Sequence, residues 1–317
     1  MQALAITQFG QTPTWQAVAD PGPVPAGHVL LRVKAVGLNP ADNKVLNGEF
    51  AGRFLHARKF PLVAGYDFSG IIESVGEGVT DLRVAQAVFG HLPYSGKNAQ
   101  GALGEFLVVL AEQVAVKPDG VSHEIAAATA TTASTALQSL RDLGHLAAGG
   151  RVLINGASGG VGSHGVQIAR LLGAEVTATC SAAKMRFVES LGCDTVVDYR
   201  DTPMRALQGS FDVVFDAAGA ASYGICAHLM APAGVYVTTL PDAGLIWGKL
   251  LTLFSKRSAK VVVVQSRRAD LTQLGEWLAA GQLRTPLEET YTDDEIGAAL
   301  ARMASREVTG KLAVTLR

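Results

Sequence analysis

A glycine-rich turn between a predicted strand and a predicted helix is the strongest chemical signal in the sequence. Residues 151–173 read RVLINGASGGVGSHGVQIARLLG, with the turn at Gly156–Gly162. In the dinucleotide pattern G-x-G-x-x-G, Ala157 stands at the first glycine, and Gly159 and Gly162 stand at the second and third. The second glycine lets backbone approach a pyrophosphate, the third lets the helix pack on the strand, and the helix N-terminus offers unpaired N–H groups. We therefore predict cofactor contacts at Ser158, Gly159, Gly160, Val161 and Gly162; the alternative is a turn without a ligand.

The end of the next predicted strand indicates which dinucleotide binds. An NAD site has an Asp or Glu there, which holds the ribose 2′-hydroxyl. The segment EVTATCSAAKMR has no carboxylate between Val176 and Arg186; Ser181 stands where it would cap the next helix, and Lys184 lies in its first turn. A cation there opposes the helix dipole unless a 2′-phosphate pairs with it. This favours NADPH, with Ser181 and Lys184 as contacts; the alternative is that Lys184 is an ordinary solvated lysine.

Two kinds of pattern divide the chain. Up to about residue 120, short alternating strands such as HVLLRVKAV are separated by turns that contain Gly or Pro, which is typical of a small barrel or sandwich. From Arg151, nearly all-apolar strands alternate with helices, which indicates a doubly wound parallel sheet. The predicted fold class is therefore α/β, with one domain at 1–120, completed by 267–317, and a dinucleotide-binding domain at 121–266.

Composition and charge exclude several classes of protein. Of 317 residues, 48% are hydrophobic and 17% charged, and the net charge is -1. The chain is too apolar for disorder and lacks the basic excess of an extended nucleic-acid surface. Its three cysteines, far apart and without a CxxC pair, exclude a disulfide scaffold and a Cys-rich structural zinc site. With neither a signal-peptide pattern nor a run of 18 apolar residues, we expect a soluble protein of the cytoplasm without a membrane span.

Several segments resemble one protein family in order and spacing: VGLNPADNKVLNG, FPLVAGYDFSGIIESVGEGV, INGASGGVGSHGVQIARLLGA, ATCSAAKMRFVESLGCDTVVDY, FDVVFDAAG and TGKLAVTL. The family is the zinc-free quinone oxidoreductase branch of the medium-chain dehydrogenase/reductase superfamily, and the SAAK and GYD forms are most similar to its enone and alkenal reductases. The resemblance implies a GroES-like β-barrel domain and a Rossmann domain, with NADPH in the cleft between them.

The resemblance also implies that no catalytic metal is present. Zinc-dependent members carry a Cys after the first long strand and a His in a GHE motif. Here the corresponding places hold Leu38 or Asn39, and Tyr66. Without a Lewis acid, alcohol dehydrogenation is disfavoured. What remains is hydride donation to an acceptor that is already electron-poor, such as a quinone or a carbonyl-conjugated C=C bond.

Three residues are candidates for catalysis because the resemblance places their loops around the nicotinamide. Tyr66 and Lys44 could donate a hydrogen bond to the oxygen that becomes negative after hydride transfer, and Asn39 could orient the amide or ribose. Each has a structural alternative. Asn39 precedes a proline and suits a turn, Tyr66 suits a buried ring, and Lys44 suits the surface.

Five further cofactor contacts complete the predicted site. By resemblance, Thr135 lies beside the nicotinamide, Tyr199 lies near the adenosine ribose phosphate, and Lys311 matches a terminal Gly-Lys. Thr239 and Leu240 end a predicted parallel strand, and ligands lie at that edge of open α/β sheets.

The preferred hypothesis is an NADPH-dependent reductase of small quinones or α,β-unsaturated carbonyls. The alternatives are an enoyl-thioester reductase and a non-catalytic NADPH-binding protein with a structural, sensory or RNA-binding role, since fold does not fix function. The last apolar strand, KVVVVQ at 260–265, predicts a homodimer through a free sheet edge. The segment 243–260 joins apolar residues to a basic end. It best suits a packed helix with a solvated end; the alternatives are a substrate cover, part of the dimer contact and, less favoured, a segment that lies on a membrane surface.

Overall fold

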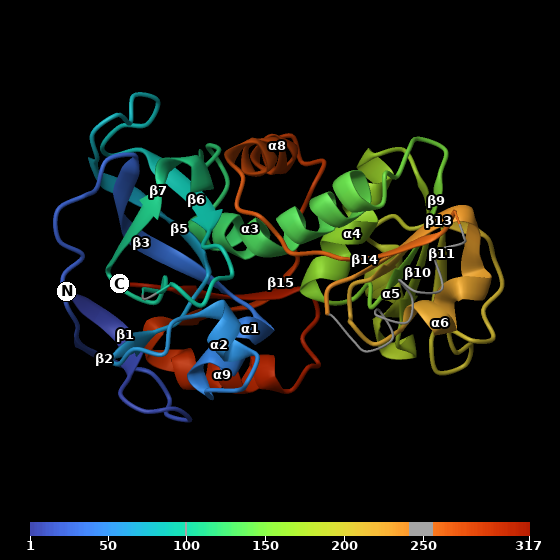
Figure 1. Ribbon diagram of the computed structural model, residues 1–317, viewed down its shortest axis with the longest axis horizontal. Helices are drawn as coiled ribbons and strands as arrows, with labels where there is room; N and C mark the ends of the chain where they lie inside the picture. The colour runs from blue at the N-terminus through green and yellow to red at the C-terminus, as the bar shows by residue number, and fades with distance from the viewer. Residues whose placement is uncertain (99, 241–255) are drawn as a thin grey trace. The chain divides into compact units, whose positions relative to one another are not determined.

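The structure is a computed structural model that describes residues 1–98, 100–240 and 256–317 (Figure 1). The chain divides into two compact units. Unit 1 comprises Met1–Ser134 and Gln265–Arg317, and unit 2 comprises Thr135–Val264. The first boundary thus lies later than the predicted residue 120, because the helix that follows is shared. Its early turns belong to unit 1, where a Cβ atom on Gly37 would lie only 2.8 Å from the Cα of Ala128.

Unit 1 is built on a seven-stranded sheet of order β15-β16-β3-β5-β6-β8, with β7 paired to β3, and on a three-stranded sheet of order β2-β1-β4. The predicted alternation of HVLLRVKAV is confirmed, because alternate residues of β3 from Val29 onward are buried. Its elements are β1 (Gln2–Ile6), β2 (Thr14–Ala17), β3 (His28–Leu38), α1 (Pro40–Leu46), α2 (Gly52–Leu55), β4 (Leu62–Val63), β5 (Asp67–Val75), β6 (Ala87–His91), β7 (Phe106–Leu110), β8 (Val114–Val116), α3 (His123–Leu137), α8 (Arg268–Ala279), β15 (Leu287–Thr292), α9 (Ile296–Ala304) and β16 (Lys311–Thr315), with 3-10 turns at Ala111–Gln113 and Asp293–Glu295.

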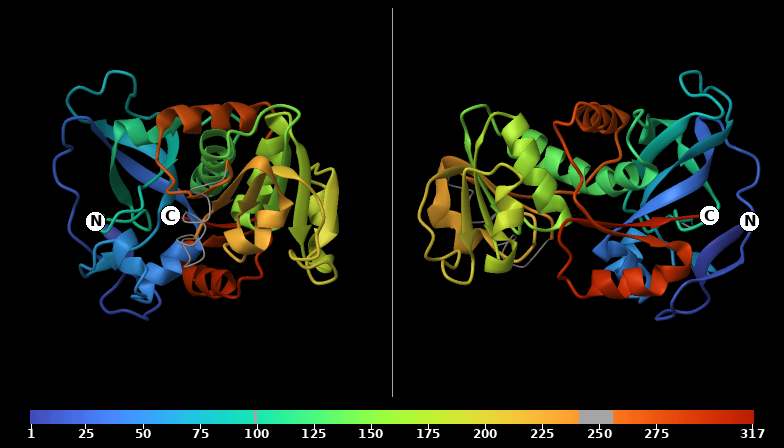
Figure 2. Two further views of the ribbon diagram at one scale, coloured as in Figure 1. Left: turned by 45° about the vertical axis from the view of Figure 1, so that its right-hand side comes forward. Right: turned by 180° about the vertical axis from the view of Figure 1, so that it is seen from behind.

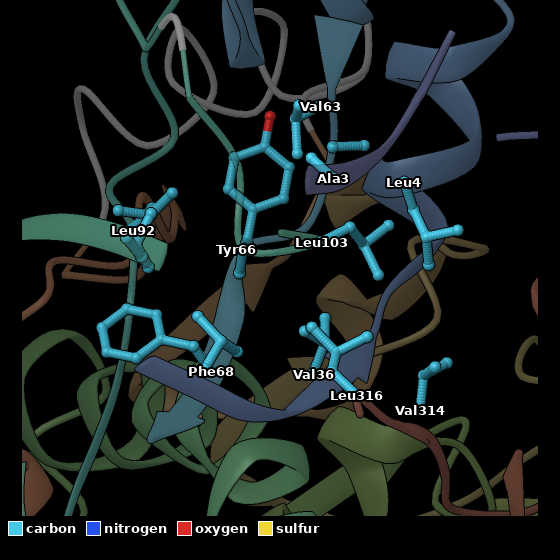
Figure 3. Packing of buried hydrophobic residues seen from close by; sticks show 14 of the residues in the cluster. Ala3, Leu4, Val36, Val63, Tyr66, Phe68, Leu92, Leu103, Val314 and Leu316 are labelled. Carbon is cyan, nitrogen blue, oxygen red and sulfur yellow. The ribbon is translucent and has the colours of Figure 1, made fainter. Parts of the chain in front are cut away.

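The core of unit 1 gathers side chains from both ends of the chain. Leu4, Tyr66 and Leu316 belong to one buried hydrophobic cluster. Figure 3 shows the ring of Tyr66 within this cluster, with its hydroxyl oxygen on the side away from Phe68 and Val36. The strand pairing explains the mixture, because β16 pairs antiparallel with β3 and thereby brings the C-terminus into the sheet. Figure 2 shows the red C-terminal strand beside the blue N-terminal strands.

Unit 2 contains a six-stranded sheet of order β11-β10-β9-β12-β13-β14 in which every pair is parallel. This is the strand order of a Rossmann fold, so the predicted α/β class is confirmed. Its elements are a π-helical turn (Gln138–Leu143), β9 (Arg151–Asn155), α4 (Gly160–Leu171), β10 (Glu175–Cys180), α5 (Met185–Glu189), β11 (Thr195–Asp198), β12 (Phe211–Asp216), α6 (Tyr223–Cys226), β13 (Met230–Thr238) and β14 (Ser258–Val261), with 3-10 turns at Ala182–Lys184 and Ala227–Leu229.

The last strand of unit 2 is shorter than predicted. The sequence placed it at 260–265, whereas β14 ends at Val261, opposite Thr238, which is the last residue of β13. Beyond that point no residue of β13 lies opposite β14 in the described part of the chain. The apolar part of the 243–260 segment, up to residue 255, lies outside the described residues. In the described part of the chain, no helix is long and apolar enough to cross a membrane.

Candidate functional site

The glycine-rich turn follows β9 as predicted, but the tight turn uses a different glycine. Gly156, directly after β9, has a φ of +81°, and a Cβ atom there would lie 2.6 Å from the Cβ of Ala218. Both facts require glycine. Ala157, which the sequence pattern assigned to the first glycine, is buried. The role of the first glycine is therefore taken by Gly156, one residue earlier than predicted.

The other two glycines of the pattern have opposite surroundings. A Cβ atom on Gly162 would lie 2.2 Å from the carbonyl oxygen of Gly156, so α4 can approach the turn only with glycine there. A Cβ atom on Gly159, the residue that precedes α4, would meet nothing closer than 3.7 Å. Gly159 therefore borders open space beside the N-terminus of α4. This arrangement fits a dinucleotide, because packing requires the third glycine while the second leaves backbone accessible to a pyrophosphate.

A row of polar side chains crosses the carboxyl ends of the strands and supports the turn. Asn155 donates to Asp216 at 2.8 Å and accepts from the hydroxyl of Thr179 at 2.7 Å. Asp216, fully buried, also accepts from the backbone N–H of Ala221 at 2.8 Å and from the hydroxyl of Tyr236 at 3.2 Å. The sequence analysis missed this network. Polar residues ending three neighbouring parallel strands were the available signal.

The end of β10 carries the residues predicted to select the cofactor. Ser181 is the residue before the 3-10 turn and has extended backbone, but its side chain makes no capping hydrogen bond. Lys184 ends that turn and is half-buried. The backbone N–H of Tyr199 donates to Cys180 at 3.1 Å, so the end of β11 lies beside Ser181. Arg200, whose guanidinium lies 5.9 Å from the ring of Tyr199, adds a second cation that the sequence analysis did not single out.

The remaining residues predicted in unit 2 lie at two places. Thr239 follows β13, donates its N–H to the carbonyl oxygen of Asp216, and is therefore fixed at the carboxyl edge of the sheet. Leu240 is half-exposed, and its side chain occupies the place where a Cβ atom on Gly219 would stand, 2.6 Å away. Thr135, the first residue of unit 2, is buried in the last turns of α3.

In unit 1, Tyr66 has a buried hydroxyl that makes no hydrogen bond to any described residue. Its ring packs against Tyr94, with ring centres 4.5 Å apart, and edge-on against His56 at 6.5 Å. Burial, and to a smaller extent the charge of Asp42, raises the pKa of the Tyr66 hydroxyl far above its ordinary value. The hydroxyl is therefore a proton-bearing donor at neutral pH. A buried, unpaired donor costs about 1–3 kcal/mol, which a ligand oxygen would recover.

Asn39 and Lys311 are two of the predicted site residues, and the structure places them in contact with each other. The ammonium of Lys311 donates to the side-chain oxygen of Asn39 at 2.7 Å. The amide nitrogen of Asn39 donates to Asp67 at 2.9 Å. Both residues are buried, and the side-chain amide of Asn39 is used within unit 1 on both sides. Asn39 directly follows β3, whose last residue, Leu38, pairs with Leu312 of β16, so the pairing of the two strands brings Asn39 and Lys311 together.

A second buried carboxyl group, in addition to that of Asp67, lies next to Asn39. Asp42 accepts the backbone N–H of Asn39 at 2.7 Å and that of Gly65 at 3.1 Å. Burial raises the pKa of Asp42 to about 7; the negative charge of Asp67 acts in the same direction, and the Asn39 hydrogen bond opposes both. Lys44, on α1 two residues later, is half-buried, and its ammonium makes no ion pair or hydrogen bond within the described part of the chain.

The positions that correspond to zinc ligands in zinc-dependent members carry other residue types in this chain. At the places where the resemblance expects zinc ligands in zinc-dependent members, unit 1 has Leu38, Asn39 and Tyr66. Across residues 1–98, 100–240 and 256–317, no three His, Cys, Asp or Glu side chains are grouped so that they could hold a metal ion.

Two family descriptions match the chain, one over each part. Residues 25–131 match the alcohol dehydrogenase GroES-like domain, and residues 191–314 match the family described as zinc-binding dehydrogenase. The first match lies entirely in unit 1. The second covers the later strands of the six-stranded sheet and the C-terminal return into unit 1.

Individual relatives are similar over almost the whole chain. The trans-enoyl reductase pgmF of Aspergillus terreus is 32% identical over 91% of this chain and 86% of its own. The 2-methylene-furan-3-one reductase of Solanum lycopersicum is 29% identical over 99% of this chain and 79% of its own. Among solved structures, the quinone oxidoreductase from Coxiella burnetii has a TM-score of 0.89 and 26% identity, with 100% of this chain and 99% of that chain covered.

Proposed function

The chain belongs to the medium-chain dehydrogenase/reductase superfamily, and on that premise we propose that it transfers hydride from NADPH to a quinone or a carbonyl-conjugated C=C bond. Membership makes it an oxidoreductase with a nicotinamide cofactor. We propose, beyond this, that the protein prefers NADPH to NADH and that its acceptors belong to these two classes. The observation that carries the acceptor class is the buried Tyr66 hydroxyl, which has no protein partner among the described residues. Such a donor suits a substrate oxygen that becomes negative.

Cofactor binding is assigned to unit 2. Backbone N–H groups from Gly159 to Gly162 would hold the pyrophosphate beside the N-terminus of α4. Ser181, Lys184 and Tyr199 would hold the adenosine ribose and its 2′-phosphate, with Arg200 as a second cation. Thr135, Thr239 and Leu240 would line the nicotinamide half. When bound, NADPH supplies the hydride, and the protein supplies orientation and electrostatics.

Charge stabilisation is assigned to unit 1. Hydride addition to the β-carbon of an enone develops negative charge on the carbonyl oxygen, and the Tyr66 hydroxyl would donate to that oxygen. The raised pKa of Tyr66 keeps the proton on the donor at neutral pH. Lys44 would be a second source of a hydrogen bond or proton. No Lewis acid is part of the proposal, because Leu38, Asn39 and Tyr66 offer neither a thiolate, an imidazole nor a carboxylate.

Replacing Tyr66 with Phe tests this assignment. We expect kcat for enone reduction to fall about tenfold, or about 1.4 kcal/mol, because one donor to the oxyanion is lost while the ring stays packed. Quinone reduction should fall less, since a quinone needs less electrophilic help. Tyr94→Phe is the matched control, because it removes a hydroxyl from the neighbouring ring. An enone rate unchanged in Tyr66→Phe would make Tyr66 a packing residue.

A substrate panel distinguishes the candidate functions. An enoyl thioester is the second candidate acceptor, and similarity to a protein named trans-enoyl reductase supports an enoyl substrate. NADPH oxidation should be measured with quinones, enones and enoyl thioesters of matched acyl chain. We expect kcat/KM to be highest for a quinone or an enone. A clear preference for the thioester would favour the second candidate, and NADPH binding without turnover of any acceptor would indicate a non-catalytic role.

We also propose that the protein is a homodimer. Among the described strands, β14 pairs with β13 alone and is the edge of its sheet. Val263, directly beyond it, is 72% exposed. Light scattering should give twice the chain mass, and Val263→Lys should shift the protein toward the monomer. Val116→Lys, at a 48% exposed valine in unit 1, should leave the dimer intact. A wild-type monomer at all concentrations would contradict the proposal.

A further inference from the structure

Lys311 is the most deeply buried cation for which the structure gives a full set of partners. It is 2% exposed, and its ammonium donates to the carbonyl oxygen of Leu38 at 2.7 Å, to Asn39 at 2.7 Å and to Asp67 at 3.2 Å. An ammonium has three donors, and these contacts use all three. A direct bond from Lys311 to a cofactor phosphate would have to break one of them.

One partner of Lys311, Asp67, is the chain neighbour of the residue that we assign to the substrate oxygen, Tyr66. Asp67 follows Tyr66 in the chain and also accepts the backbone N–H of Thr131 at 3.1 Å and the amide of Asn39 at 2.9 Å. Gly65, on the other side of Tyr66, donates its N–H to Asp42. The backbone is therefore held on both sides of Tyr66, whereas the Tyr66 hydroxyl itself has no partner among the described residues.

The positive charge of Lys311 compensates the negative charge of Asp67, which is buried beside it. Asp67 is fully buried, and Lys311 is the cation that pairs with it. Removing one partner of a buried ion pair leaves an uncompensated charge, which is strongly destabilising in that place. The cation arrives from β16, which pairs with β3 at Leu312 and Leu38, so the last strand of the chain holds the end of β3 and the start of β5 together.

We propose that Lys311 is a positioning residue for Tyr66 and not a ligand of the cofactor. It fixes Asp67 and Asn39, and Asp67 in turn fixes the backbone that aims the Tyr66 hydroxyl. The catalytic part of this inference rests on the proposed function, in which Tyr66 donates to the substrate oxygen.

A double-mutant cycle tests the coupling. Lys311→Met should lower kcat for enone reduction about tenfold when Tyr66 is present and should have almost no further effect in the Tyr66→Phe background. The dissociation constant of NADPH should change less than about twofold, whereas loss of a phosphate ligand would raise it about tenfold or more. Lys311→Arg, which keeps the charge, should recover part of the rate. If Tyr66→Phe itself lowers kcat, equal further losses from Lys311→Met in both backgrounds would overturn the proposal.

A second measurement reports the position of Tyr66 without any activity. With 3-fluorotyrosine at the six tyrosines, the ¹⁹F signal of Tyr66 is assigned by its absence in Tyr66→Phe. This signal should shift toward the solvent-exposed value in Lys311→Met and return in Lys311→Arg. If Lys311→Met does not fold, Asp67→Asn combined with Lys311→Met removes both charges and carries the same measurement.

The two measurements separate the two proposals. A moved Tyr66 signal together with an unaffected enone rate in Tyr66→Phe would uphold the positioning role of Lys311 and reject the catalytic role of Tyr66. An unmoved signal would reject the positioning role whatever the rates. An unmoved signal together with weakened NADPH binding would indicate that Lys311 binds the cofactor.

Discussion

Gly162→Ala is expected to destabilise unit 2 by about 3 kcal/mol, the upper part of the usual range for overpacking. The added methyl group would lie 2.2 Å from the carbonyl oxygen of Gly156 and 2.7 Å from the Cα of Ala157. Both are backbone atoms, so relief requires α4 to move away from the turn rather than a side chain to rotate. Urea unfolding monitored by circular dichroism measures the change, and a midpoint equal to that of the wild type would contradict the close packing.

Alanine substitutions at two other glycines serve as controls for Gly162→Ala. Gly159→Ala should keep the stability of the wild type, because its methyl group would meet nothing closer than 3.7 Å, but it should weaken NADPH binding at least about tenfold by filling the approach to the backbone. Gly224→Ala, in α6, has no atom within 4 Å of the added carbon and should alter neither property. Normal NADPH binding by Gly159→Ala would mean that the pyrophosphate does not lie on this turn.

Lys184→Ala is expected to weaken NADPH binding by about 1–3 kcal/mol, the usual range for a charge-assisted hydrogen bond. NADH binding should be almost unchanged, because NADH lacks the 2′-phosphate that we assign to this cation. The end of β10 carries no carboxylate that would hold a ribose 2′-hydroxyl instead. Quenching of protein fluorescence by each cofactor gives both dissociation constants.

Neighbouring cations provide the controls for Lys184. Arg200→Ala should also act on NADPH alone, since Arg200 lies beside Tyr199 at the end of β11. Arg186→Ala, at an exposed position on α5, should affect neither cofactor. Equal losses for NADPH and NADH in Lys184→Ala would show that the lysine supports the fold of the turn and does not select the cofactor.

The strands and the dinucleotide turn could be predicted because their signals are local. A nearly all-apolar strand followed by a glycine-rich turn and a helix occupies only 23 consecutive residues, from Arg151 to Gly173. The observed β9 and α4 both lie within this segment, at Arg151–Asn155 and Gly160–Leu171. In such a unit, the side-chain period and the glycine spacing follow from backbone geometry alone. The general rules for parallel connections then restrict the possible orders of the six-stranded sheet, and the structure shows which order is adopted.

Other features depend on neighbours that the local pattern does not contain. The lack of space for a Cβ atom at Gly156 is caused by Ala218, which follows β12 and is distant in sequence; this contact, with the positive φ, places the first glycine of the pattern one residue earlier. The last strand ends at Val261 because β13 provides no partner beyond Thr238. Neither the position of the first glycine nor the end of the last strand can be predicted from the local sequence alone.

By itself, the sequence determined the fold class, the dinucleotide turn and the absence of a carboxylate at the end of β10, because each is a property of contiguous residues. Only the tertiary structure decided what the polar residues of unit 1 do. Asn39 and Lys311 are 272 residues apart, and they meet because β16 returns to pair with β3. Their types suited a ligand equally well. Burial explains why they pair with each other, because a buried ammonium must be paired, and Asp67 and Asn39 lie within its reach.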